Sequence, residues 1–237
     1  MYSIDKTIIL DEENPLKKVD VQNRSVPIEN DMGAYIFNCS QSLSLVSSAI
    51  DKTKLSILLL ENSYKIRPEV EGFTPDEFIE YAIENYFIRS GAIYDRCLIF
   101  TNSLHELGIA NESIGHSLIV TNSHVVKSGL EKKLKSLRKI CTEHRVERNK
   151  IVHHGRYSEE SFNIISAMHK VHGYQKILGN DLDFDQEFLN DFTHEIVDIQ
   201  AGEFKEHLAK VEAKIAEFFE LAEKVYLETK EKHRHKI

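Results

Sequence analysis

Residues 74–107, "TPDEFIEYAIENYFIRSGAIYDRCLIFTNSLHEL", carry the clearest helical pattern in the chain. Thr74 suits a helix cap, Pro75 suits the first helical position, and Glu77 stands where a capping box requires an acid. Mostly apolar side chains then recur at steps of three and four residues, at Ile79, Ile83, Tyr86, Ser90, Ile93, Cys97, Phe100, Leu104 and Leu107. This spacing places them on one face of a helix, which Gly108 is expected to end. The stretch therefore predicts a long helix that packs its stripe against other helices.

Three more segments repeat this pattern, over residues 34–64, 129–155 and about 185–230. A short helix capped by Ser158 is expected in the stretch "SEESFNIISAMHKV". All four prolines precede residue 76, which favours helices in the remaining chain. We therefore predict an all-α protein, an antiparallel helical bundle of four long helices plus one short helix.

The segments outside these helices are less regular. Residues 1–32 are expected to form an irregular N-terminal arm with a short strand at "KTIIL", and residues 33–237 a single helical bundle domain. The connection over residues 109–129 has no clear structure in the sequence. The N-terminus lacks a basic region followed by a long apolar stretch, and no apolar run approaches membrane-spanning length. Three widely spaced cysteines, Cys39, Cys97 and Cys141, fit reduced thiols in a helical core, so we expect a cytoplasmic protein without a membrane partner.

The charge is distributed unevenly along the chain. The formal net charge is −8, yet residues 127–156 contain ten Lys or Arg and only three Glu. A basic element in an acidic protein suits a polyanion such as RNA. A solvated, lysine-rich helix face fits the same charges equally well.

The basic segment ends in "ERNKIVHHGR", residues 147–156. At about 100° per residue, the apolar stripe of this helix continues to Arg148, which should therefore face the interior. An arginine there needs an anionic partner, either a carboxylate in a structural salt bridge or a bound phosphate. Asn149 and His153 lie on another side, with His153 roughly 140° from Arg148, so both reach one site only in a groove completed by a second element or subunit. Gly155 permits a sharp turn just beyond.

The stretch "RNKIVH", residues 148–153, at the end of a basic helix in an all-helical chain resembles the signature of the HEPN superfamily. The resemblance implies a metal-independent endoribonuclease that acts at the interface of a homodimer and needs no cofactor. It implies that Arg148 and His153 are the catalytic pair and that Asn149 is a polar orienting residue. The neighbouring residues expected to contact RNA are Arg145, Lys150, His154 and Arg156.

This chemistry suits the side chains. Histidine transfers protons near neutral pH, and arginine donates paired hydrogen bonds to phosphate oxygens. The expected product is a 2′,3′-cyclic phosphate. The chain looks like a stand-alone bacterial member of the abortive-infection or toxin type, which implies a role in stress or phage defence and leaves room for an antitoxin protein as a partner. Two alternatives stay open: a catalytically inactive helical dimer that binds RNA or protein, and a metal-dependent helical-bundle hydrolase that uses histidines such as His144, His153, His154, His169 and His172.

Overall fold

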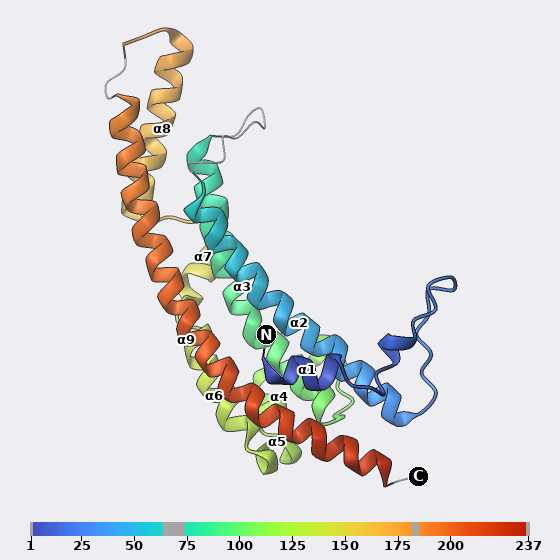
Figure 1. The fold of residues 1–237 in the computed structure, drawn as a ribbon. Coiled ribbons are helices and arrows are strands. Elements are labelled where there is room, and N and C mark those ends of the chain that lie inside the picture. Colours follow the sequence, from blue (N-terminus) through green and yellow to red (C-terminus); the bar gives the residue numbers. More distant parts are fainter. Residues whose placement is uncertain (1, 64–73, 182–184, 236–237) are drawn as a thin grey trace. The chain divides into compact units, whose positions relative to one another are not determined.

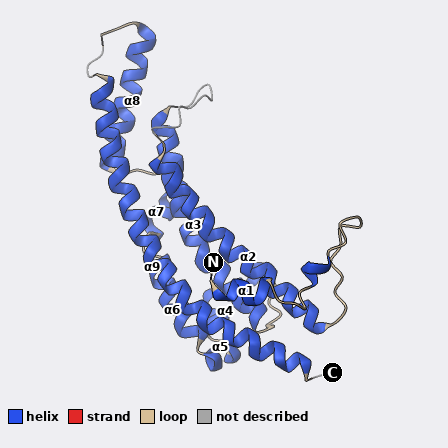
Figure 2. Cartoon of the chain, in the orientation of Figure 1, coloured by secondary structure: helices blue, strands red, loops and turns tan. Residues whose placement is uncertain are grey.

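The computed structural model describes residues 2–63, 74–181 and 185–235, apart from the side chain of His154. Within these ranges the chain is helical, and its only β pairing is an isolated bridge between Asp20 and Ser25 (Figure 2). The α-helices are α1 (Ser3–Ile9), α2 (Asp31–Glu61), α3 (Pro75–Leu104), α4 (His116–Val120), α5 (Ser123–Ser128), α6 (Leu130–Cys141), α7 (Arg145–His154), α8 (Glu160–Leu178) and α9 (Gln186–Arg234), with short 3-10 helices η1 (Pro15–Lys18) and η2 (Asn111–Ser113) (Figure 1). The predicted all-α class is confirmed. None of the helices in these ranges combines the length and apolar character needed to cross a membrane.

Contacts divide the chain into two compact units. The first unit contains residues 1–50, 92–142 and 210–237, and the second contains residues 51–91 and 143–209. Helices α2, α3 and α9 contribute residues to both units. The predicted division into an arm over residues 1–32 and one domain over residues 33–237 stays a prediction.

In the first unit, α2 runs antiparallel to α3 and α9. Tyr35, near the start of α2, donates a hydrogen bond to the carbonyl of Leu104 at the end of α3 (3.3 Å). Its ring also stacks on Tyr226, near the end of α9, with centroids 5.5 Å apart. The three cysteines of the chain are buried thiols, as expected for core residues.

Helix α6 completes this packing by running antiparallel to α9. Gly129, which precedes α6, lies beside Leu221, and Lys133 one turn later pairs with Glu217 at 3.0 Å. Numbers that rise along α6 therefore fall along α9. The long helices α2, α3 and α9 and helix α6 therefore alternate in direction, as the sequence predicted for an antiparallel bundle.

The strand predicted at residues 6–10 is wrong, because this segment belongs largely to α1. Ile4 and Ile8 are 1% and 0% exposed, whereas Leu10 is 56% exposed. Lys6 lies between them and is exposed, whereas a strand would place Lys6 on the same face as Ile4 and Ile8, so the burial follows a helical rather than a strand pattern. Asn14 anchors the end of α1 by donating hydrogen bonds to the carbonyl of Ile8 (3.1 Å) and to the Ser40 hydroxyl (2.8 Å).

The single helix predicted over residues 129–155 is two helices, α6 and α7. The break falls at Thr142, whose hydroxyl donates to the Arg138 carbonyl at 2.8 Å. Threonine is a poor interior helix residue because its branched, polar side chain offers the backbone such local alternatives. The helix expected in residues 158–171 is also longer, because α8 reaches Leu178, and its N-cap is Glu159 rather than Ser158. The Glu159 carboxylate accepts from the backbone N–H of Phe162 at 3.2 Å.

In the second unit, α8 packs antiparallel to both α3 and α9. The Ser166 hydroxyl donates to the buried carboxylate of Asp76 at 2.7 Å, which joins α8 to the first turn of α3. His169 of α8 and Thr193 of α9 share a hydrogen bond of 3.0 Å. Further along, Tyr86 of α3 stacks on Phe204 of α9 with ring centroids 3.7 Å apart. These contacts form the frame that holds α7.

Candidate functional site on and beside helix α7

Helix α7 has well-defined ends. His144 occupies the N-cap position, and its carbonyl accepts the first helical hydrogen bond from the backbone N–H of Arg148 at 3.0 Å. Gly155 ends the helix in the left-handed region at φ 102°, a conformation that an L side chain rarely adopts. The turn predicted at Gly155 is therefore confirmed, and it directs the chain into the loop over residues 155–159.

Arg148 lies half-buried against Gly91 of α3. A β-carbon added at Gly91 would meet the Arg148 Cδ at 3.1 Å and its Nε at 3.4 Å, so the absence of a side chain at Gly91 makes room for the arginine. The Arg148 Nε is buried without a hydrogen-bond partner, and no ion pair joins the guanidinium to any residue that the structure describes. The inward position matches the sequence expectation, but the carboxylate of a structural salt bridge is not seen within the described ranges.

The other polar residues of α7 lie on its exposed side. Asn149, His153 and Arg145 are exposed, and so is Arg156 beyond the helix end. Val146 and Val152 add apolar surface on this side, being 61% and 55% exposed. Arg148 therefore packs on α3 while His153 is exposed to solvent. The side chain of His154 lies outside what the structure describes.

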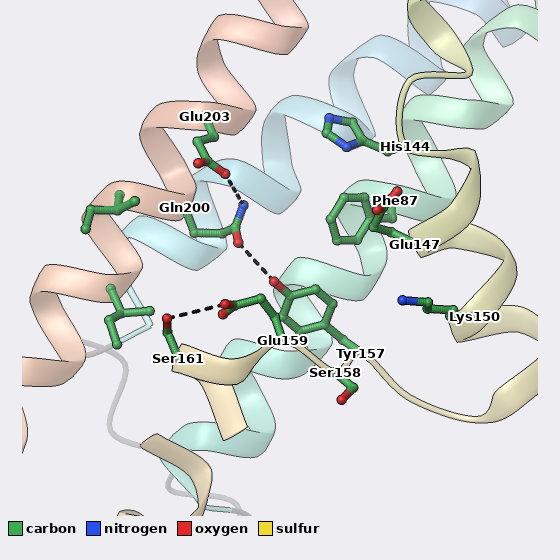
Figure 3. Close-up of a pocket in the computed structure, with 12 residues that line it drawn as sticks. Phe87, His144, Glu147, Lys150, Tyr157, Ser158, Glu159, Ser161, Gln200 and Glu203 are labelled. Atoms are coloured by element: carbon green, nitrogen blue, oxygen red, sulfur yellow. Dashed lines mark hydrogen bonds between the residues drawn. The ribbon is translucent and has the colours of Figure 1, made fainter. Parts of the chain in front are cut away.

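A pocket of about 570 Å³ lies beside α7, entirely within the second unit (Figure 3). Its walls come from α3, α7, the following loop, α8 and α9. The lining residues are Phe87, His144, Glu147, Lys150, Tyr157, Ser158, Glu159, Ser161, Ile196, Ile199, Gln200 and Glu203. Of the residues predicted for the site, only Lys150 lines this pocket, whereas Arg148, Asn149 and His153 do not.

Tyr157 organises one wall of the pocket. Its backbone N–H donates to the Glu84 carboxylate at 2.7 Å, which holds the loop against α3. Its hydroxyl donates to the Gln200 side-chain oxygen at 3.1 Å, and the Gln200 amide in turn donates to Glu203 at 3.2 Å (Figure 3). The Tyr157 ring lies 5.7 Å from that of Phe87 between centroids. The orientation of the Gln200 amide is fixed by this relay.

The pocket lining is acidic. Glu147, Glu159 and Glu203 contribute three carboxylates, against the single ammonium group of Lys150. Burial raises the pKa of the Tyr157 phenol, and the negative charges of Glu159, Glu203 and Glu147 raise that pKa further. The phenol therefore stays protonated and remains a donor to Gln200.

A second polar cluster lies behind His144. The His144 and His207 rings meet edge to face with centroids 4.5 Å apart. The Tyr86 hydroxyl donates to the Phe204 carbonyl at 3.0 Å and also lies 2.6 Å from His207 Nδ1. This places a buried histidine, hydrogen-bonded to Tyr86, in contact with the histidine that lines the pocket.

Sequence reasoning found α7 but not the pocket. Tyr157, Gln200 and Glu203 carry no local motif, and they meet only because α9 returns to the loop after α7. In the part of the chain that the structure describes, no three His, Cys, Asp or Glu side chains are grouped so as to hold a metal ion.

Comparison with known proteins identifies the family of this chain. Neither the curated proteins nor the solved structures gave a match to the chain. The model of a HEPN family, described as Cthe2314-like HEPN, matches residues 38–226, which is well over half of the sequence. The matched range contains the "RNKIVH" stretch together with the helices that surround it. The chain therefore belongs to the HEPN superfamily.

Proposed function

We propose that this protein is a metal-independent endoribonuclease whose catalytic residues are Arg148 and His153, with Asn149 as an orienting residue. The observation that supports the proposal best is the state of Arg148, whose buried Nε has no partner among the described residues. A buried guanidinium nitrogen without a partner is costly, and arginine pairs with the phosphate oxygens of RNA through charge-assisted hydrogen bonds. The exposed cations Arg145 and Arg156 lie beside it on the same segment.

The proposed reaction is an internal transesterification. The ribose 2′-oxygen attacks the phosphorus and forms the cyclic phosphate, while the bond from phosphorus to the 5′-oxygen breaks. One histidine takes the 2′-hydroxyl proton, and a second acid gives a proton to the leaving 5′-oxygen. Arg148 stabilises the charge that develops on the phosphorane oxygens. The histidine at position 153 supplies both proton transfers when two copies of the chain contribute to one site.

The surface of α7 supports such a pairing of copies. Arg148 packs on α3, while Asn149 and His153 are exposed with Val146 and Val152 beside them. A second copy of the chain that packs on this surface would remove both valines from water. In a symmetric dimer the same α7 surface of each copy meets its equivalent and brings a second His153 toward each Arg148.

The decisive experiment is RNA cleavage in excess chelator. Wild type, Arg148→Ala and His153→Ala are incubated with structured RNA, and the new ends are tested for a 2′,3′-cyclic phosphate. Arg89→Ala and His124→Ala are the matched controls, because both residues are exposed and lie outside the proposed site. We expect cleavage by wild type and both controls, and a loss of about 100-fold or more in the two site variants. Cleavage that survives both site substitutions contradicts the proposal.

A growth assay tests the proposed role in stress or phage defence. Expression of an active ribonuclease should slow growth unless an antitoxin protein is co-expressed, and Arg148→Ala should remove this effect. RNA binding by wild type without any cleavage supports the inactive RNA-binding alternative instead.

A further inference from the structure

The pocket beside α7 is not used by the proposed cleavage reaction. Its volume of about 570 Å³ lies in the range of small-molecule and nucleobase sites. Three carboxylates in its lining repel phosphate. An occupant must therefore bring hydrogen-bond donors or positive charge rather than a phosphate group.

Part of the polar lining is already satisfied within the chain. Gln200 is held between Tyr157 and Glu203. The two oxygens of Glu159 accept from the Phe162 backbone and the Ser161 hydroxyl. These groups shape the wall, and each already has a partner within the chain.

Three other groups remain available. Glu147 and Lys150 lie three residues apart on α7, yet they form no ion pair with each other or with any other residue that the structure describes. Glu203 uses one oxygen on Gln200 and keeps the other. Figure 3 shows the Lys150 ammonium group directed into the cavity. The pocket thus offers two carboxylate acceptors and one ammonium donor.

We propose that this pocket binds a guanine base. Guanine presents two N–H donors, at N1 and N2, that a carboxylate accepts as a pair, and two acceptors, O6 and N7, that a lysine contacts. The available Glu147, Glu203 and Lys150 have this complementary set. Phe87 and Tyr157 add aromatic surface, and Ile196 and Ile199 add aliphatic surface, for the faces of the ring.

The position of the pocket suggests how a base would enter with RNA. Glu147 and Lys150 lie on the same helix as Arg148, so a guanine in the pocket leaves its phosphates outside the acidic lining and near the cationic side of α7. The base adjacent to the cleaved phosphate is then read by the pocket. This placement in the substrate rests on the proposed ribonuclease function, whereas guanine binding in itself does not.

The direct test is the binding of free nucleotides to the full chain. Calorimetry with GMP, IMP, AMP, CMP and UMP is expected to show GMP bound about tenfold or more tightly than AMP, CMP or UMP. IMP, which lacks the N2 amine, should bind more weakly than GMP. Glu147→Gln and Glu203→Gln should each lose about tenfold in GMP affinity, while the control Glu195→Gln, an exposed glutamate of α9 outside the pocket, should keep it.

Two outcomes overturn the inference. Equal binding of all five nucleotides, or none, removes the guanine assignment. Spermidine that binds in a Glu147- and Glu203-dependent manner, with GMP failing to compete, makes the pocket a polycation site instead.

Sequencing of cleavage products separates this inference from the proposed function. Cleavage next to guanine by the wild type, with this preference lost in Glu203→Gln and kept in the control Glu195→Gln, supports both. Cleavage without base preference overturns the guanine pocket and leaves the ribonuclease standing. If the protein binds GMP but cuts no RNA, the guanine pocket stands and the proposed ribonuclease function is contradicted.

Discussion

Replacement of Gly91 by alanine tests whether the fold reserves space for Arg148. Gly91 lies inside α3, where glycine is less favourable than alanine by about 1 kcal/mol. A β-carbon at this position would come within 3.1 Å of the Arg148 Cδ, closer than ordinary van der Waals contact. The arginine must then move by a few tenths of an ångström away from α3.

Gly202 in α9 provides the matched control, because a β-carbon there meets nothing within 4 Å. Gly202→Ala should raise the free energy of unfolding by about 0.5–1 kcal/mol and the Tm by about 1–4 °C. Gly91→Ala gains the same helix propensity but loses about 1 kcal/mol to the displaced arginine, so its net effect should be close to zero. When Arg148 is first replaced by alanine, nothing is displaced and the full gain should return.

Urea denaturation of wild type, Gly91→Ala, Arg148→Ala and the double variant measures this coupling, which should be about 1 kcal/mol. An equal effect of Gly91→Ala in both backgrounds refutes the packing of Arg148 on Gly91. Arg148→Ala alone should cost no more than about 1–2 kcal/mol, because only packing of the aliphatic stem is lost. A loss of about 3–5 kcal/mol, typical of a broken buried ion pair, refutes the unpartnered state of the guanidinium.

Two further predictions concern the first unit. Ile8→Ala should lower the free energy of unfolding by about 2–4 kcal/mol because this side chain is 0% exposed, whereas Leu10→Ala, at 56% exposure, should change it by less than about 0.5 kcal/mol. Equal effects in urea denaturation would show that α1 does not pack as described. Burial lowers the pKa of His105 to about 4, so between pH 6.5 and about 4 the unfolded chain binds a proton that the folded chain does not. Stability should therefore fall as the pH decreases through this window, and His105→Asn should show a shallower fall; identical slopes for the two proteins contradict the buried, neutral histidine.

Long helical stripes were predictable because each satisfies the same spacing many times. The α9 stripe Phe204, Leu208, Val211, Ile215, Phe218, Ala222 and Val225 is buried at every position. Residues 6–10 gave no such redundancy, since "KTIIL" contains only a short apolar run that fits a strand as well as a helix. Tertiary contacts decide there, and the helical conformation buries Ile4 and Ile8 together while it leaves Lys6 exposed.

The break between α6 and α7 was missed for a related reason. No proline or glycine marks Thr142, and the apolar spacing continues through His144 and Arg148 to Ile151. The spacing of apolar residues indicates which side chains face inward, but it does not indicate whether the backbone hydrogen bonds of the helix are continuous. The inward position of Arg148 was therefore predicted correctly on a helix whose extent was wrong.

One part of the candidate site could be predicted from the sequence, and the pocket could not. Arg148, Asn149 and His153 share one helix, so their relative directions follow from helical geometry. The pocket depends on contacts such as those of Tyr157 with Glu84 and Gln200, which are 73 and 43 residues distant in sequence. No local pattern in the sequence encodes those pairings.

Several features around α7 lower the stability of the isolated chain. A glycine occupies a helix interior at position 91, a buried guanidinium nitrogen of Arg148 lacks a partner, and Val146 and Val152 are exposed. An arginine with a purely structural role would have a carboxylate beside it and would not need a glycine opposite. In the proposed function, a phosphate of RNA would relieve the arginine and a second copy of the chain would cover the valines. Local costs that binding would remove in this way are typical of functional sites, and this is the physical argument for the proposal.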